Sequence, residues 1–194
     1  MQNGLNEDGL KSLKEMQVDG ITPDAMTFVC ILKACGNMGL AKMGEEIHGE
    51  VRRKGLLGKN TVLNTALVDM YAKCGLLGKS QEIFDKLSVR DVVSWSAIIT
   101  AYAQHGNGVE ALKHFEQMQR EGVSPNAITF VSVLKACGSI GASYTGQEIH
   151  AKIASEGFLR KDIVLGTALI DMYGKCGLLE KAQEVFDQLP VRDV

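Results

Sequence analysis

The sequence predicts an all-α fold, a right-handed α-solenoid of stacked helix-turn-helix repeats. Three observations lead to this prediction. A long unit is duplicated without gaps, apolar residues recur with the period of an α-helix, and glycines interrupt that period at regular intervals. A single helical hairpin of about 35 residues cannot bury its apolar stripe alone, so neighbouring hairpins must stack on one another.

The duplication covers almost the whole chain. A shift of 102 residues aligns residues 1–92 with residues 103–194, and 48 of the 92 aligned pairs are identical. TFVCILKACG (27–36) aligns with TFVSVLKACG (129–138), and TALVDMYAKCGLL (65–77) aligns with TALIDMYGKCGLL (167–179). Agreement of this extent indicates a recent duplication of a long unit.

Each duplicated unit divides into hairpins of two amphipathic helices. Within residues 92–126, apolar residues at i, i+3, i+4 and i+7 form one stripe, a glycine-containing turn follows at 105–108, and a second stripe runs up to the Gly122–Pro125 stop signal. The first stripe is Trp95, Ile98, Ile99 and Tyr102, and the second is Ala111, Leu112, Phe115 and Met118. The same pattern divides the chain into a truncated repeat at 1–24 and five repeats at 25–60, 61–91, 92–126, 127–162 and 163–193, with residue 194 opening another.

Composition gives few hints of function. The formal net charge is -2, which by itself favours neither nucleic acid nor a membrane surface as a partner. No apolar run approaches the roughly 18 residues that span a bilayer, so no membrane segment is expected. The five cysteines are odd in number and lack C-x-x-C spacing, so we expect small, reduced, buried side chains rather than a metal or redox site. They are Cys30, Cys35, Cys74, Cys137 and Cys176.

Several motifs resemble catalytic or ligand-binding sequences, but each lacks a residue or a structural context that the chemistry requires. GLLGKS (75–80) ends like a phosphate-binding loop, but Lys73 stands where that loop requires glycine. GNGVEA (106–111) follows a helix rather than a strand, which argues against a dinucleotide site. His48 and His150 have no second ligand at metal spacing, so packing or a partner-facing role is expected for them. We therefore expect no catalytic residue, cofactor, metal or small-molecule substrate.

The first helix of each repeat carries a second, mostly polar face. Counting the first helical residue as position one, positions two, five, nine and thirteen fall within about 80° of each other, opposite the apolar stripe. A lysine occurs on this face in four of the five repeats, namely Lys33, Lys73, Lys135 and Lys175. The pattern alone fits an ordinary solvated helix face as well as it fits a binding surface.

The repeat lengths and motifs resemble the pentatricopeptide repeat family in its plant-type arrangement of standard, long and short motifs. VVSWSAIITAYAQHG with EALKHFEQMQREGVSPN is similar to the standard motif, TFVSVLKACG with GQEIHAKI to the long motif, and TALIDMYGKCGLLEKAQEVFDQLPVRDV to the short motif. The resemblance covers the whole chain, and its truncated first repeat implies a piece of a longer array.

The resemblance implies binding of single-stranded RNA at one base per repeat, read by position five together with the last residue of the repeat. In the family's code, Thr or Ser with Asp implies guanine and Ser with Asn implies adenine, which agrees with the acceptor-only chemistry of aspartate. The long repeats carry Val29 and Val131 at position five and are expected to read weakly or not at all. The implied pairs are Thr65 with Asp91, Ser96 with Asn126, and Thr167 with Asp193, preceded by Asp24 alone, which gives 5′-(G/U)NGANG-3′.

Other roles follow from the same resemblance. Aliphatic residues at position two are implied to pack against base faces, namely Val62, Val93 and Val164. The four lysines above are candidates to contact phosphates. With so few lysines and a net charge of -2, we expect weak and salt-sensitive binding by this chain alone.

As a cellular role, the resemblance implies the recognition part of a chloroplast or mitochondrial RNA-editing or RNA-processing factor, with protein partners from an editing complex. Catalysis in such factors is attributed to a separate deaminase-like domain, whose H-x-E and C-x-x-C signatures do not occur in this sequence. The competing hypothesis is a protein-interaction scaffold, because helical solenoids also present concave surfaces to peptides.

Overall fold

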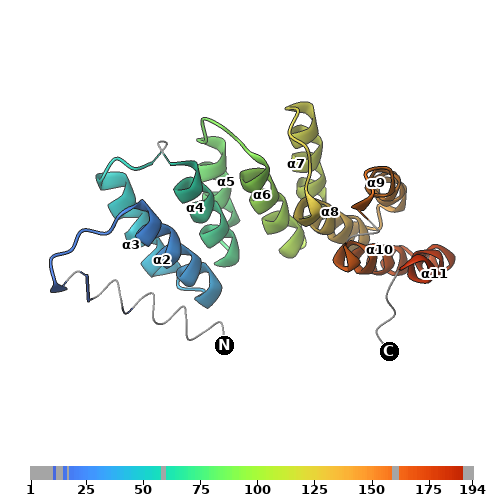
Figure 1. Ribbon diagram of the computed structural model, residues 1–194, viewed down its shortest axis with the longest axis horizontal. Helices are drawn as coiled ribbons and strands as arrows, with labels where there is room; N and C mark the ends of the chain where they lie inside the picture. The colour runs from blue at the N-terminus through green and yellow to red at the C-terminus, as the bar shows by residue number, and fades with distance from the viewer. Residues whose placement is uncertain (1–10, 12–14, 17, 58–59, 159–161, 190–194) are drawn as a thin grey trace. The chain divides into compact units, whose positions relative to one another are not determined.

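The computed structural model describes residues 11, 15–16, 18–57, 60–158 and 162–189. Within these residues, ten helices can be given with their bounds, residues 11, 15–16 and 18 are also helical, and no strand occurs. None of the described helices is long and apolar enough to cross a membrane. The prediction of an all-α fold is therefore confirmed for this part of the chain (Figure 1).

The helices alternate between a first and a second helix of each hairpin. The first helices begin at Ala25, Thr61, Val92, Ala127 and Ile163, the residues with which the predicted repeats begin. The assignment of the hairpins to long, short and standard classes stays a prediction. The bounds are α2 Ala25–Met38, α3 Ala41–Arg53, α4 Thr61–Lys73, α5 Leu77–Asp85, α6 Val92–Gln104, α7 Gly108–Arg120, α8 Ala127–Ile140, α9 Ser143–Ser155, α10 Ile163–Lys175 and α11 Leu179–Gln188.

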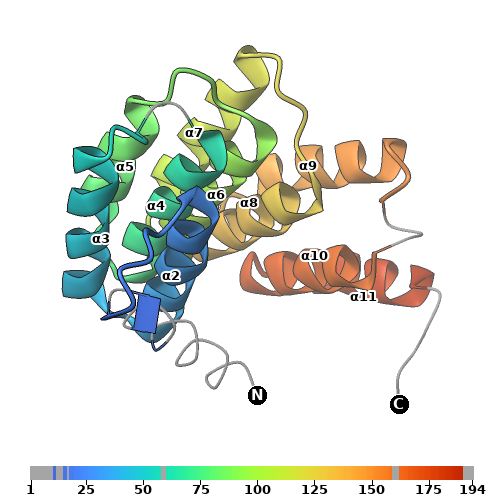
Figure 2. The same ribbon diagram turned by 60° about the vertical axis from the view of Figure 1, so that its left-hand side comes forward.

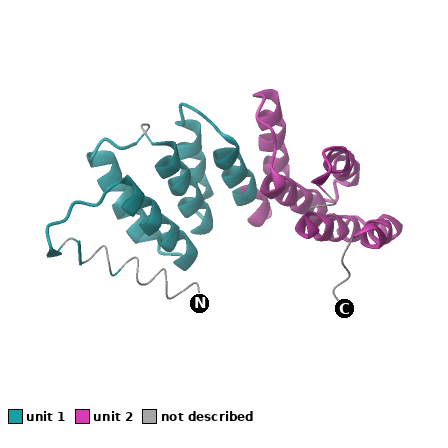
Figure 3. Cartoon of the chain, in the orientation of Figure 1, with its two compact units in different colours: residues 1–101 teal, residues 102–194 magenta. Residues whose placement is uncertain are grey.

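The chain forms two compact units, residues 1–101 and residues 102–194, with the boundary near the end of α6 (Figure 3). In the first unit, α2 packs against α3 and α4, and α4 packs against α3 and α5. Helices α2, α4 and α6 form one layer, and α3 and α5 form the other (Figures 1 and 2). The apolar stripes predicted from the sequence lie between these layers, where Phe28, Leu32, Leu67 and Met70 are fully buried.

The second unit repeats this packing. Helix α8 packs against α7, α9 and α10, and α10 packs against α9 and α11. Phe130, Leu134, Leu169 and Met172 are the buried counterparts of the four residues named above. In each unit, therefore, first helices lie against first helices of the next hairpin, which is the stacking expected of a helical repeat array.

Glycines fix two details of the hairpins. Gly39 and Gly141 end α2 and α8 in the left-handed conformation, with φ of 68° and 70°, which a residue with a Cβ rarely adopts. Gly44 and Gly146 allow close approach, because a Cβ there would lie 2.7 Å from Met70 Cε and 2.8 Å from Met172 Cε. Helix α3 therefore lies directly against α4, and α9 lies directly against α10.

The cysteines only partly follow their predicted burial. All five are free thiols, and Cys35 and Cys137 are buried, with burial raising the pKa of Cys35 to about 11 and that of Cys137 to about 12. The expectation of burial is wrong for Cys30, which is exposed. Cys30 occupies position six of α2, about 200° around the helix from the apolar residue at position four, and so lies off the buried stripe.

Candidate nucleic-acid interface

Wherever the structure describes both, the last residue of a predicted repeat caps the helix that follows it. In each case a side-chain oxygen accepts a hydrogen bond from a backbone N–H in the first turn, which satisfies a donor that has no partner within the helix. The cap holds the side chain at the start of the first helix and occupies one of its oxygen atoms. The capping residues are Asp24, Asn60, Asp91, Asn126 and Asp162.

Aspartate and asparagine caps present different chemistry. Asp91 accepts from Ser94 N through Oδ1 at 2.8 Å, and its other carboxylate oxygen can accept a further hydrogen bond. Asn126 accepts from Thr129 N through Oδ1 at 2.9 Å, and its own N–H donates to Thr129 Oγ1 at 3.3 Å. This cap uses the amide oxygen of Asn126. The aspartate side chain therefore contributes only acceptors, whereas the asparagine side chain also carries N–H donors.

Asp24 is the exposed member of the set. It accepts from both the backbone N and the Oγ1 of Thr27 at 2.7 Å. The backbone hydrogen bond from Thr27, helped by the hydroxyl, lowers the pKa of Asp24 below its ordinary value. Its carboxylate is thus held in the ionised, acceptor-only form at neutral pH.

The position-five hydroxyls lie in three different environments. Thr65 is 9% exposed, and its Oγ1 is buried without a hydrogen-bond partner among the described residues. Ser96 is also buried and donates to Val92 O at 2.6 Å, whereas Thr167 is exposed and donates to Ile163 O at 3.0 Å. A buried hydroxyl without a partner is costly, so Thr65 is the position-five residue with most to gain from a ligand.

Each first helix exposes an aliphatic side chain two residues after its cap. These five side chains are 56% to 64% exposed. Single exposed aliphatic residues are common on protein surfaces. Here, however, they occur at the same position of five successive hairpins, which is a regular pattern. They are Met26, Val62, Val93, Ile128 and Val164.

The four lysines fall into two classes. Lys73 pairs with Asp69 at 2.8 Å and also donates to Asn37 Oδ1 at 3.1 Å, and Lys175 pairs with Asp171 at 2.6 Å. Lys33 and Lys135 are exposed, and neither forms an ion pair with a described residue. The charges of Lys73 and Lys175 are thus partly neutralised, which leaves Lys33 and Lys135 as the stronger candidates to attract phosphate.

The members of the predicted pairs lie in different parts of the chain. Thr65 and Asp91 belong to the same unit, whereas Ser96 lies in the first unit and Asn126 in the second. Thr167 is described, but its predicted partner Asp193 lies outside the described residues. The sequence-based prediction missed the capping role of these Asp and Asn residues, and it did not include Met26 and Ile128 among the aliphatic residues expected to contact bases. An Asp or Asn directly before each apolar-periodic segment was the available signal for the caps.

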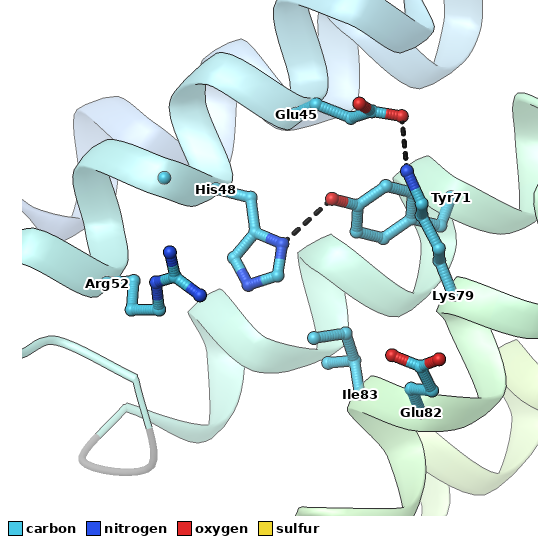
Figure 4. A pocket seen from close by; sticks show the side chains of 8 residues that line it. Glu45, His48, Arg52, Tyr71, Lys79, Glu82 and Ile83 are labelled. Carbon is cyan, nitrogen blue, oxygen red and sulfur yellow. Dashed lines mark hydrogen bonds and ion pairs between the residues drawn. The ribbon is translucent and has the colours of Figure 1, made fainter.

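A second feature of the first unit lies between α3 and α5 (Figure 4). A cavity of about 260 Å³ is lined there by Glu45, His48, Gly49, Arg52, Tyr71, Lys79, Glu82 and Ile83. His48 Nδ1 and Tyr71 OH are hydrogen-bonded at 2.8 Å, and Lys79 pairs with Glu45 at 2.6 Å. Burial, and next the charge of Arg52, lowers the pKa of His48, while burial raises the pKa of Tyr71 to about 12.

The second unit contains the same histidine–tyrosine bond. His150 Nδ1 and Tyr173 OH are hydrogen-bonded at 2.8 Å, and burial lowers the pKa of His150. Both histidines thus join a second helix to the first helix of the next hairpin. Among the described residues, no group of three or more His, Cys, Asp or Glu side chains is placed to hold a metal ion.

Family models match most of the sequence. A model described as "PPR repeat family" matches residues 90–139, one described as "PPR repeat" matches 65–92 and 167–194, and one described as "Pentatricopeptide repeat domain" matches 1–38 and 11–71. Together they account for residues 1–139 and 167–194.

Curated relatives share this repeat. A pentatricopeptide repeat-containing protein of Arabidopsis thaliana is 36% identical over 193 residues, covering 100% of this chain and 28% of the relative. A mitochondrial member from the same plant is 36% identical over 92% of this chain, and a chloroplastic member is 39% identical over 89%. This chain spans 32% and 28% of those two relatives, so it corresponds to about a third of their length or less.

Solved structures share the fold. The pentatricopeptide repeat protein PPR10 from maize superposes with a TM-score of 0.68 at 21% identity, over 92% of this chain and 26% of PPR10. Its complex with an 18-nucleotide psaJ RNA element gives 0.58 at 22% identity, over 94% of this chain and 32% of that one. The corresponding domain of Arabidopsis thaliana protein-only RNase P 1, in complex with tRNA, gives 0.64 at 18% identity, over 84% and 88%. The likeness shows that the stacked hairpins of this chain have the same fold.

Proposed function

The chain belongs to the pentatricopeptide repeat family, and on this basis we propose that it binds single-stranded RNA in a sequence-specific manner, one base per repeat. The observation that carries the proposal is the fivefold recurrence of an exposed aliphatic side chain beside an Asp or Asn helix cap. Stacking on apolar side chains provides affinity for any base, and a polar side chain of fixed orientation distinguishes among bases. Two of the similar solved structures are complexes with RNA.

The caps support the proposed base assignments. Asp91, with one carboxylate oxygen left to accept, suits the N–H donors on the pairing edge of guanine. Asn126, whose cap uses Oδ1, can offer its amide N–H to the N1 acceptor of adenine. With Thr65, Ser96, Thr167 and Asp193 in the remaining roles, the proposed preference is 5′-(G/U)NGANG-3′.

The long repeats serve as non-reading positions in this proposal. Val29 at position five is buried and has no hydrogen-bonding group. Met26 and Ile128 are nevertheless exposed like the three predicted stacking valines, so the long repeats can still hold a base by its face. They would therefore maintain the spacing between read bases without selecting them.

The proposed cellular role is the recognition part of an organellar RNA-editing or RNA-processing factor of the standard, long and short motif subfamily. Relatives named mitochondrial and chloroplastic support an organelle as the location. Catalysis would belong to other parts of such a factor or to partner proteins, because the sequence-based prediction assigns this chain recognition only.

The test is a change of base preference. Binding to labelled oligonucleotides containing GUGAUG, or the same sequence with guanine at the fourth base, is measured by fluorescence anisotropy at low salt. Asn126→Asp preserves the cap and should move the preference at the fourth base from adenine to guanine by about tenfold, since one good hydrogen-bonded base contact discriminates by about 1–3 kcal/mol. Raising the salt should weaken binding to every oligonucleotide.

Asn60→Asp is the matched control. It makes the same chemical change at a cap, but in a repeat whose position five is Val29, so no base preference should change. Equal binding of both oligonucleotides by Asn126→Asp would show that the reading assignment is wrong. A chain that binds no single strand at low salt would favour the protein-interaction scaffold instead.

A further inference from the structure

We infer that the residue before each base-reading cap is a positioning residue, and that Arg90 fills this role for Asp91 by stacking its guanidinium on two aromatic rings. The inference rests on the proposed reading of a base by Thr65 and Asp91. It adds a residue that determines how sharply the base is selected without touching it.

Arg90 lies against both hairpins that it connects. Its guanidinium carbon is 5.0 Å from the ring centroid of Phe84 on α5 and 5.8 Å from that of Trp95 on α6. One of its terminal nitrogens donates to Asp85 O at 3.4 Å, at the end of α5. The two rings themselves meet edge to face at 4.7 Å. The guanidinium therefore contacts a rigid aromatic pair that spans the junction.

Asp91 is held from its C-terminal side by the helix that it caps. Oδ1 accepts from Ser94 N at 2.8 Å, and its backbone oxygen accepts from Trp95 N at 3.0 Å and from Ser94 Oγ at 2.9 Å. On its N-terminal side the chain runs through residues 86–90, where regular helix has ended. Anchored by Leu87, which is 9% exposed, and by Arg90, this segment sets the direction from which the chain enters the cap.

The standard repeats reach the same result with a different residue. Pro23 precedes Asp24 and Pro125 precedes Asn126, and both prolines are buried. A proline ring fixes its own φ near about −65° and so restricts the chain on entry to the cap. The short repeats carry Arg90 before Asp91 and Arg192 before Asp193 instead. Two kinds of rigid anchor thus occupy one position, as expected if the reader must be approached from a fixed direction.

The chemistry of the anchor explains the choice of arginine. A guanidinium is planar and stacks on aromatic faces, whereas a lysine ammonium is a compact, strongly hydrated charge. Lys at position 90 would keep the charge and lose the stacked plane. The anchoring is therefore expected to depend on shape as well as charge.

The experiment compares base selectivity with stability. For the 194-residue chain, binding is measured to GUGAUG and to its variants at the third base, which faces Thr65 and Asp91 in the proposal. Arg90→Ala should lower the preference for guanine over adenine at the third base by about fivefold, the effect of losing one partly buried cation–π contact. Arg90→Lys should recover only part of it. Thermal unfolding of each variant confirms that it is folded at the temperature used.

Three controls are available in the same molecule. Arg90→Ala should leave the preference for adenine at the fourth base and guanine at the sixth base unchanged, because Pro125 and Arg192 serve those positions. Conversely, Pro125→Ala should weaken selection at the fourth base and spare the third. Asp91→Asn should move the third-base preference towards adenine, which shows that this base is read at all.

Three outcomes would overturn the inference. Arg90→Ala could lower affinity equally for all oligonucleotides, which would give Arg90 a purely structural role. It could also leave the third-base preference intact although the variant is folded. Finally, a parent chain without any third-base preference, unaffected by Asp91→Asn, would refute the proposed function itself, and with it the inference.

Discussion

Residues 25–91 and residues 127–193 are two copies of the same pair of hairpins, one in each unit, and their contacts can be compared one by one. The His48–Tyr71 bond recurs as His150–Tyr173, the contact of Gly44 with Met70 recurs as that of Gly146 with Met172, and the Lys73–Asp69 pair recurs as Lys175–Asp171. Between the second helices, in contrast, the Glu45–Lys79 ion pair is replaced by a hydrogen bond between Gln147 and Lys181, and Arg52 is replaced by Ala154.

The difference shows which interactions can change between the two copies with little loss of folding free energy. Of the kept contacts, the two that join the helix layers involve buried or part-buried atoms, where a missing partner or a misplaced methyl group costs free energy. The kept Lys73–Asp69 pair is instead an exposed contact within one helix. Partners exposed between second helices contribute little to stability, so they can be exchanged. The kept and exchanged contacts can be tested separately, beginning with the largest expected effect.

The close contact between glycine and methionine should be the most sensitive. Gly44→Val places side-chain carbon where Met70 Cε lies, and Gly146→Val does the same at Met172, so each should lower the free energy of unfolding by about 2 kcal/mol through overpacking. Urea denaturation gives the value. The control is Gly49→Val, at a position where a Cβ meets nothing within 4 Å and where the second copy has Ala151. Equal stabilities of the Gly44 and Gly49 variants would contradict the packing argument.

Loss of the tyrosine hydroxyl should have a moderate effect in both copies. Tyr71→Phe and Tyr173→Phe each remove a part-buried hydrogen bond and should cost about 1 kcal/mol. Thermal or denaturant unfolding of each single variant measures the cost. Tyr144→Phe, which alters an exposed ring, should change nothing. A large effect in one copy and none in the other would show that the two bonds are not equivalent.

Acidification should weaken both copies in the same pH range. Burial lowers the folded-state pKa of His48 and His150 below 6.5, so the unfolded chain binds protons more readily than the folded one. The stabilisation is complete above pH 6.5 and decreases as the pH falls through the lowered values. Unfolding free energies measured between pH 7.5 and pH 5 should fall less steeply for His48→Gln or His150→Gln, and least for the double variant. An unchanged slope in all three variants would exclude these histidines as the cause.

Exchange of the Glu45–Lys79 ion pair should have the smallest effect on the free energy of unfolding. Glu45→Gln gives the first copy the residue of the second, and it should change the free energy of unfolding by about 0.3 kcal/mol, because the ion pair with Lys79 is half exposed. Gln147→Glu makes the reverse exchange and should be equally small. Denaturant unfolding at low and high salt measures both, and a cost above that of Tyr71→Phe would overturn the distinction between kept and exchanged contacts.

Much of the architecture could be predicted from the residues. The stripe at Trp95, Ile98 and Ile99 is fully buried, and the helices begin where the repeat count places position one, because period and glycine turns are local signals. The partners of His48 and His150 could not be predicted in the same way. Each tyrosine is 23 residues away, and only packing of one hairpin on the next brings it to 2.8 Å.

The candidate interface shows a similar division. Side chains on one helix face could be grouped from their spacing, and the exposure of Val62, Val93 and Val164 agrees with that grouping. The burial of Thr65 depends on neighbouring hairpins, and so does the hydrogen bond that Lys73 donates to Asn37 of the preceding one. Spacing within one helix contains no information on either contact.

The capping role of the proposed base-reading residues limits how the proposed RNA preference could be redirected to new sequences. Each of these residues must satisfy the free N–H groups of a helix as well as meet a base, and only Asp, Asn, Ser and Thr side chains do so well. Recoding among these four residues should preserve the fold, whereas a reader such as alanine costs about 1 kcal/mol in every repeat where it is introduced. Helix stability therefore limits which residue types can occupy the proposed base-reading positions. In a long recoded array, the loss of folding free energy would add up over every repeat that carries a poor capping residue.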